Sequence, residues 1–287
     1  MLNAAARARP VTKVRPNNHV RTIDGIDLFC RDWGQGRPLL FLSGWCLNSL
    51  MWGYQMEPLA RDGFRCIAYD RRGHGRSGDA GGGYDFDTLA DDLAAVIEAL
   101  DLDEVTVVAH SFASGEIVRY LTRHGGSRVA GVLMLAPAAI PFLAKTADNP
   151  AGIDIGMLNA RTAELAEDFP GWAERNAAPY FAGQGSRGII DATLGIMNMA
   201  SHQAMLALTD IQGATDFRPE LVRLDTRTLF IHGDRDASIP LEITSRPACD
   251  LVKGAQLVVY EGGPHGLYVT HKDRLNRDIA AFARGVA

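Results

Sequence analysis

Three side chains of the sequence could together activate a hydroxyl group for attack on a carbonyl carbon. They are Ser111, an aspartate of the turn at 233–236, and His265. A serine hydroxyl is a poor nucleophile until a histidine takes its proton, and a carboxylate must hold that imidazole in the correct tautomer. The chain order serine, acid, histidine is the order found where a nucleophile sits on a sharp strand-to-helix turn. These residues therefore predict nucleophilic catalysis by Ser111.

The stretch around Ser111 predicts such a turn. Residues 105–108 are rich in β-branched side chains and predict a buried strand, and a helical pattern begins at 116–120. A turn this tight strains its central residue and admits only small residues two positions away on either side. Ala109 and Ala113 hold these positions, where glycine is commoner. The pattern indicates a relaxed G-x-S-x-G elbow; the alternative is a small-residue junction carrying an ordinary serine.

The acid is chosen between two aspartates of one turn. We expect Asp236 to orient His265, with Asp234 as the alternative. A metal site made of His232, Asp234 and Asp236 is a further alternative, but nothing nearby in the sequence supplies the remaining ligands. We therefore expect neither a metal nor a cofactor.

Two backbone N–H groups are candidates for an oxyanion hole, which needs donors aimed at the charge that develops on the substrate oxygen. One belongs to Phe112, the residue after the nucleophile. The other belongs to Trp45, which follows the Ser43-Gly44 bend at the end of an apolar run. Two histidines receive structural interpretations: we expect His110 to pack beside the elbow and His74 to hold its own turn.

The elements that must position these residues alternate between strand and helix. Such alternation predicts a mostly parallel sheet with helices on both faces, and sites in such sheets lie at the carboxyl ends of the strands. The predicted strands are 19–23, 26–33, 38–43, 64–69, 105–109, 129–135, 227–232 and 256–260, and the clearest predicted helices are 51–61, 87–100 and 275–283.

The alternation stops at about Pro137 and resumes after about Leu221. Helix-forming and bulky apolar residues fill this interval, which we interpret as a helical lid over the carboxyl ends of the strands. The expected organisation is a flexible basic leader at 1–18, a core at 19–136 and 222–287, and a lid at 137–221.

Composition narrows the class of function. The 287 residues carry a net charge of −5, which argues against nucleic-acid binding, and no uncharged stretch is long enough to span a membrane. Four cysteines, Cys30, Cys46, Cys66 and Cys249, are scattered without a C-x-x-C pair. We expect reduced thiols and a cytoplasmic protein, with one disulfide as the alternative.

These motifs resemble those of the α/β-hydrolase superfamily and, more narrowly, of its cofactor-free haloperoxidase and arylesterase-like branch. The similarity covers nearly everything after the leader and implies an α/β-hydrolase fold. In the family pattern the aspartate three positions after the glycine of the His-Gly turn is catalytic, which corresponds to Asp236. The stretches that carry the resemblance are 69–77, 91–100, 116–120, 145–150, 232–236 and 264–266.

One departure from this branch bears on the reaction. The branch usually has His-Gly-Trp-Pro at the oxyanion loop, whereas this chain has Ser43-Gly44-Trp45-Cys46. The resemblance ties that proline to peracid formation, so one hypothesis is that Cys46 favours water over peroxide; the alternative is that Cys46 merely fills a gap beside the Trp45 ring. Under the first, Cys46→Pro should raise peroxide-dependent activity relative to ester hydrolysis, provided that the loop tolerates proline. The predicted function is a serine hydrolase of a small carboxylic ester or lactone. The alternatives are a cofactor-free perhydrolase or haloperoxidase and a low-turnover ligand-binding protein; a homodimer is left open.

Overall fold

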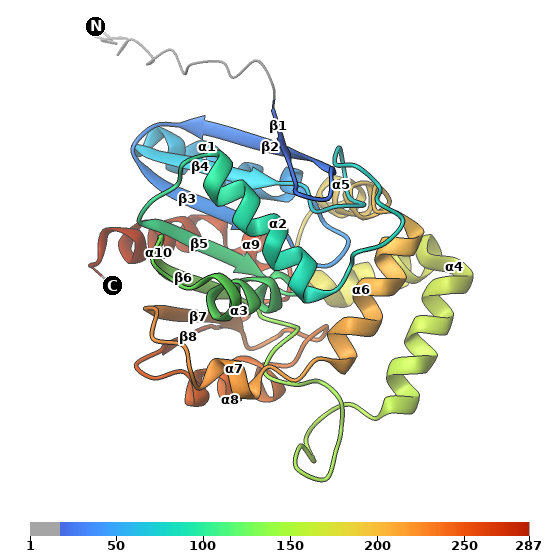
Figure 1. The fold of residues 1–287 in the computed structure, drawn as a ribbon. Helices are drawn as coiled ribbons and strands as arrows, with labels where there is room; N and C mark the ends of the chain where they lie inside the picture. Colours follow the sequence, from blue (N-terminus) through green and yellow to red (C-terminus); the bar gives the residue numbers. More distant parts are fainter. Residues whose placement is uncertain (1–17, 287) are drawn as a thin grey trace, which may run out of the picture.

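Short apolar runs form the strands of one eight-stranded sheet in the computed structural model, which describes residues 18–286 (Figure 1). The order is β1-β2-β4-β3-β5-β6-β7-β8; β1 and β2 run antiparallel to their neighbours and the other pairs are parallel. All of the predicted leader except Asn18 lies outside the described residues. The strands are β1 His19–Arg21, β2 Asp27–Gly34, β3 Arg37–Leu42, β4 Phe64–Tyr69, β5 Val105–His110, β6 Val129–Leu135, β7 Thr228–Gly233 and β8 Gln256–Tyr260.

Helices cover both faces of this sheet. Every residue of β5 is buried, and its side chains alternate between two apolar cores, with Val107 in one and Val108 in the other. Helices α2 (Phe86–Ala99), α3 (Ala113–His124) and α8 (Ser245–Leu251) contribute to the first core, whereas α1 (Gly53–Arg61) and α10 (Lys272–Arg284) contribute to the second. A strand buried on both faces is typical of a parallel sheet between helical layers. The predicted mostly parallel sheet with helices on both faces is confirmed.

The segment between β6 and β7 is helical from Ile155 onward. Its helices are α4 (Ile155–Phe181), α5 (Arg187–Met197), α6 (His202–Ala214) and α7 (Arg218–Leu221). Residues 137–154 contain no helix, only isolated β-bridges between residues 144 and 153 and between 146 and 149. Figure 1 shows α4 and α6 together beyond one end of the sheet, opposite to the carboxyl terminus of the chain.

Helix α4 is two helices joined at a kink. Asp168 has a non-helical backbone (φ −152°), and its carboxylate accepts a hydrogen bond from the N–H of Gly171 at 2.9 Å, which caps the second half. Pro170 lies two residues after Asp168, and proline favours the first turn of a helix because it has no N–H to leave unpaired. The kink lets the second half of α4 turn toward the loop that carries His265, whose Gly266 N–H donates to the carbonyl of Tyr180 at 2.9 Å.

Short elements complete the described chain: the 3-10 turns η1 (Ser49–Trp52) and η2 (Leu241–Ile243), and α9 (Leu267–Thr270). Among the described helices, none is both long and apolar enough to cross a membrane. Cys30, Cys46, Cys66 and Cys249 are all free cysteines in the structure.

Candidate active site

Ser111 occupies the turn between β5 and α3. Its backbone has φ +55°, in the left-handed region that non-glycine residues rarely adopt. Its N–H donates to the carbonyl of Leu135 at 2.9 Å, and its own carbonyl accepts from the N–H of Ala138 at 3.1 Å. Ala109 and Ala113, two positions away on either side, are fully buried. The neighbouring backbone therefore holds Ser111 in a strained conformation, as the sequence predicts for an elbow.

Ser111 and His265 are joined by a hydrogen bond of 2.9 Å between Oγ and Nε2. The Nδ1 of the same imidazole lies 2.6 Å from Oδ2 of Asp236. A carboxylate can only accept, so Nδ1 carries the proton and Nε2 is left free to accept one from Ser111. This arrangement gives a serine hydroxyl a base with the correct tautomer, and all three side chains are buried.

The backbones that carry Asp236 and His265 touch directly. A Cβ atom added to Gly233, at the end of β7, would lie 1.9 Å from the carbonyl oxygen of Gly263. The N–H of Arg235 donates to that same oxygen at 2.9 Å. Glycine at 233 is therefore required for the two turns to approach closely enough for Asp236 to reach His265.

Asp236 receives hydrogen bonds on both carboxylate oxygens. Oδ1 accepts from the N–H groups of Ser238 at 3.0 Å and Ile239 at 2.7 Å. Oδ2 accepts from His265 and also lies 3.1 Å from Nε2 of His232. Burial alone would raise the pKa of Asp236, but the charge and hydrogen bonds of His265 and His232 outweigh it and hold that pKa well below its ordinary value of 3.8. Asp236 is therefore ionised at neutral pH.

Asp234 lies elsewhere in the same turn. It is exposed, and its Oδ1 accepts from the N–H of Gly262 at 2.7 Å. His232 is buried, with Nδ1 2.7 Å from the hydroxyl of Ser245 and Nε2 3.0 Å from the carbonyl of Ile239. Of the two aspartates considered from the sequence, the structure brings only Asp236 to His265. Asp234 is exposed, whereas the other two members of the alternative metal set, His232 and Asp236, are buried.

The loop after β3 passes close to Ser111. A Cβ atom on Gly44 would lie 3.3 Å from the Cβ of Ser111 and 2.6 Å from Nδ1 of His110, so a side chain at 44 would collide with the elbow. Within the described residues, neither the N–H of Trp45 nor that of Phe112 donates a hydrogen bond. Both predicted oxyanion donors are thus free for a ligand beside Ser111.

The structure brings further residues to His265 that sequence reasoning did not assign to the site. The Nε2 of His110 lies 3.2 Å from the carbonyl oxygen of His265, so His110 holds the backbone of His265 besides packing beside the elbow. The ring of Tyr180 meets that of His265 edge to face at 5.1 Å. Together with His232, these residues fix the base. The sequence does not predict that Tyr180 lies at the site, because Tyr180 belongs to α4, which is distant in sequence from the three predicted site residues.

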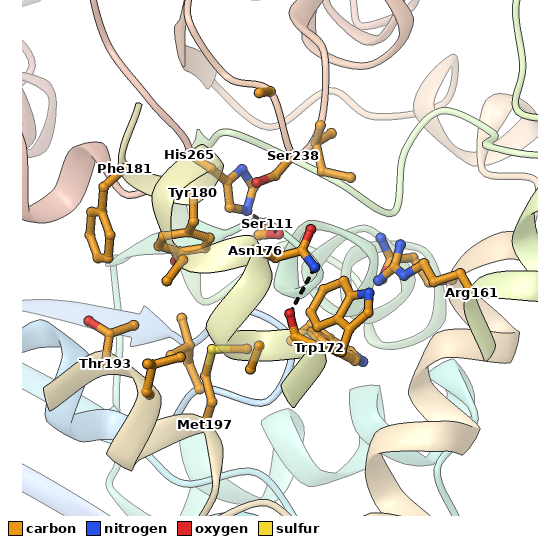
Figure 2. Close-up of a pocket in the computed structure, with 18 of the residues that line it drawn as sticks. Ser111, Arg161, Trp172, Asn176, Tyr180, Phe181, Thr193, Met197, Ser238 and His265 are labelled. Atoms are coloured by element: carbon orange, nitrogen blue, oxygen red, sulfur yellow. Dashed lines mark hydrogen bonds between the residues drawn. The ribbon is translucent and has the colours of Figure 1, made fainter. Parts of the chain in front are cut away.

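A cavity of about 530 Å³ opens over Ser111 and His265. Figure 2 shows Tyr180, Asn176 and Trp172 of α4 around it, with the amide of Asn176 donating to the carbonyl of Trp172. Most of the lining is apolar, which suits an organic substrate of modest size. The lining comes from the oxyanion loop, the elbow, the turns after β7 and β8, and helices α4, α5 and α6.

The backbone at Cys46 bears on whether the loop tolerates a proline at this position. Cys46 has φ +56° and a buried side chain, whereas the ring of proline fixes φ near −65°. A proline cannot take this position while the loop keeps its conformation. Cys46→Pro would therefore change the backbone of the loop as well as the side chain, and does not isolate the effect of the side chain on peroxide use.

Comparisons with known proteins identify the family of this chain. Residues 37–272 match the model of the alpha/beta hydrolase fold family. The chain is 37% identical over 271 residues to the non-heme chloroperoxidase CPO-A1 of Kitasatospora aureofaciens, covering 91% of this chain and 97% of that one. It is 33% identical to the bifunctional esterase/perhydrolase DCH of Acinetobacter calcoaceticus, covering 93% and 99%. Among solved structures, the esterase EaEST of Exiguobacterium antarcticum superimposes with a TM-score of 0.90 at 26% identity, covering 93% and 99%.

Proposed function

This chain belongs to the α/β-hydrolase family, in the branch of the non-heme haloperoxidases and their esterase relatives, and we propose that it is a serine hydrolase of a carboxylic ester or lactone. The observation that carries the proposal is the chain of hydrogen bonds from Ser111 through His265 to Asp236 beneath an apolar cavity. This proposed chemistry needs no cofactor.

In the first half of the proposed reaction, Ser111 forms the acyl-enzyme. As Oγ attacks the substrate carbonyl carbon, its proton passes to Nε2 of His265, and Asp236 stabilises the resulting imidazolium. The N–H groups of Trp45 and Phe112 donate to the oxygen that becomes negative. When the tetrahedral intermediate collapses, the bond to the alkoxy oxygen breaks, and His265 returns the proton to that leaving oxygen.

Water completes the proposed cycle. His265 takes a proton from a water molecule as it attacks the acyl carbon, and gives that proton to Oγ of Ser111 as the acyl bond breaks. The acid product leaves and the hydroxyl of Ser111 is restored. A lactone follows the same steps, except that the leaving alkoxide stays attached to the acyl group.

We further propose that residues 137–221 act as a lid on a core formed by 19–136 and 222–287. This is supported by the cavity lining that α4, α5 and α6 provide above Ser111. A cytoplasmic location is also proposed, supported by the four free thiols. A homodimer stays a prediction, which light scattering of the purified protein tests.

The test of the main proposal is hydrolysis of a chromogenic short-chain ester by the wild-type protein and by Ser111→Ala. The variant should fold normally and lose roughly 10⁴- to 10⁶-fold in kcat. Mass spectrometry of rapidly quenched wild-type protein should show the added acyl group on the peptide that contains Ser111. A variant that keeps more than about a tenth of the wild-type kcat would rule out the role of Ser111.

A perhydrolase is the second candidate, and the names of two relatives favour it: a non-heme chloroperoxidase and a bifunctional esterase/perhydrolase. In that reaction hydrogen peroxide replaces water in the attack on the acyl-enzyme and a peracid leaves. Halogenation that depends on both peroxide and a carboxylic acid would support it. A low-turnover binding protein is the remaining alternative. It would be favoured if ester hydrolysis shows no initial burst of product and is unaffected by Ser111→Ala.

A further inference from the structure

Arg161 is a cationic side chain in the wall of the cavity that contains Ser111. It lies on α4, and its guanidinium carbon is 5.3 Å from the ring centre of Trp45 and 5.7 Å from that of Trp172. The two indole rings meet edge to face at 5.5 Å. In the view of Figure 2, Arg161 and Tyr180 lie on opposite sides of Ser111. The aromatic rings therefore hold the guanidinium at the side of the site where the oxyanion loop begins.

Arg161 has no counter-ion within the described residues. It forms no ion pair or hydrogen bond there, and its Nε is buried without an acceptor. The one acidic residue that lines the cavity, Glu164, pairs instead with Arg175 at 2.7 Å. The nearby Cys46 thiol is no substitute, because burial raises its pKa well above the ordinary value and keeps it neutral.

An arginine in this position is costly to the free protein. Arginine stays protonated in proteins, and a partly buried charge without a partner loses hydration that the aromatic faces only partly replace. Gln212 is a second unsatisfied group in the same wall: it is buried, and its Oε1 has no partner within the described residues. Arg161 would gain hydrogen bonds from an acceptor group of a ligand in the cavity, whereas Oε1 of Gln212 is itself an acceptor and requires a donor such as a hydroxyl group.

We propose that Arg161 binds a carboxylate of the substrate, and that the substrate is therefore an ester or lactone bearing one further negative charge. A guanidinium presents parallel N–H donors that match the two oxygens of a carboxylate. One unpaired cation in a mostly apolar cavity matches one negative charge. A phosphate monoester would bring about two charges and require more donors than this wall supplies.

This inference rests on the proposed function, because it assumes that Ser111 attacks an ester. It can be tested with matched substrates that differ only at the far end of the acyl chain. The monoethyl esters of succinic, glutaric and adipic acid carry a terminal carboxylate. Ethyl butanoate, pentanoate and hexanoate have the same acyl lengths with a terminal methyl group. Release of acid at constant pH measures kcat/KM for both sets.

For at least one chain length, the wild-type protein should prefer the half-ester to its neutral partner by roughly tenfold or more. Arg161→Gln should lower this ratio by roughly 10- to 100-fold. Arg161→Lys keeps the charge without the paired donors, so its preference ratio should lie between those of the wild type and Arg161→Gln. It replaces Arg161→Gln in the test if the glutamine variant does not fold. Arg187→Gln is the matched control: it removes an exposed arginine of α5 that does not line the cavity, and should keep the wild-type ratio.

A direct binding measurement separates this inference from the proposed function. In Ser111→Ala, monoethyl adipate should change the fluorescence of Trp45 and Trp172, and adding Arg161→Gln should raise its Kd at least about tenfold. Such binding without ester hydrolysis by the wild type would support the carboxylate site and overturn the proposed function. Equal rates for half-esters and neutral esters at all lengths, or an equal loss of both in Arg161→Gln, would overturn the carboxylate site alone.

Discussion

The Nε2 of His232 and the Nδ1 of His265 meet the same oxygen of Asp236, at 3.1 Å and 2.6 Å. His232 lies at the end of β7, and its other nitrogen is 2.7 Å from the hydroxyl of Ser245. A serine hydroxyl can donate to Nδ1, which leaves the proton on Nε2 to face Asp236. His232 therefore fixes the carboxylate that in turn fixes the proposed base.

Asp236→Asn is expected to lower kcat by roughly 10⁴-fold, because an amide can donate to His265 and stabilise the wrong tautomer. Asp234→Asn should cost far less, since its carboxylate is exposed and accepts a hydrogen bond from the N–H of Gly262 rather than from His265. Steady-state rates with one chromogenic ester, measured on variants of matched melting temperature, decide between them. A larger loss in Asp234→Asn would transfer the acid role to that residue.

His232→Leu should lower kcat by roughly 10- to 100-fold through the loss of one hydrogen bond to a charged group. We expect the pH profile of kcat/KM to change as well, because Asp236 loses one of the donors that lower its pKa. His232→Gln, whose amide nitrogen can replace Nε2, should recover part of the rate. Equal loss of stability and activity in both variants, with an unchanged pH profile, would indicate a purely structural role.

The sequence predicts the fold well because the responsible patterns are local. The β-branched run at 105–108 predicts β5, and the apolar stripe of 87–100 predicts α2, observed at Phe86–Ala99. Ser111, Asp236 and His265 each follow a predicted strand, so parallel packing alone brings them to one edge of the sheet. The choice between Asp234 and Asp236 depends on where each side chain points within one turn, and the residue types of that turn do not determine these directions.

The wall of the cavity lies beyond such local patterns. Arg161 reaches Trp45 because α4 lies against the loop after β3. The residues on either side of Arg161 in the sequence form no pattern that predicts this contact. The kink at Asp168 and the positive φ at Cys46 depend likewise on tertiary packing. Residues that hold the reacting groups follow strand order, whereas residues that would select the substrate follow long-range packing.

His74 should make the protein less stable in acid. It is buried, with Nδ1 2.9 Å from the carbonyl of Arg72 and Nε2 without a partner in the described part of the chain. Burial, with the charge of Arg71, lowers its pKa from 6.5 to about 3. At pH values between about 3 and 6.5, His74 is protonated in the unfolded chain but neutral in the folded protein. The free energy of unfolding therefore falls as pH drops from about 6.5 toward 3, by up to about 1.4 kcal/mol per pH unit.

Urea unfolding of the wild type and of His74→Gln at several pH values from 4 to 7 measures this slope. The variant should have a flatter dependence of unfolding free energy on pH, whatever its stability at neutral pH. His202→Gln provides a matched control, since it makes the same substitution at a histidine that is exposed on α6. If the slope of unfolding free energy against pH is unchanged in His74→Gln, this histidine is not the group whose protonation destabilises the folded protein.

Cys46 offers a test of the oxyanion loop itself. Because φ at Cys46 is +56°, Cys46→Pro should destabilise the protein by at least about 2 kcal/mol or force the loop into another conformation. Cys46→Gly accepts the same φ and should cost less, chiefly the packing of the buried thiol. Melting temperatures of the two variants, with the ratio of peroxide-dependent to hydrolytic rate, separate backbone from side chain. If Cys46→Pro melts with the wild type and hydrolyses esters at the wild-type rate, the positive φ is not needed by this loop. If Cys46→Gly alone shifts that ratio, the thiol itself influences which nucleophile reaches the acyl group on Ser111.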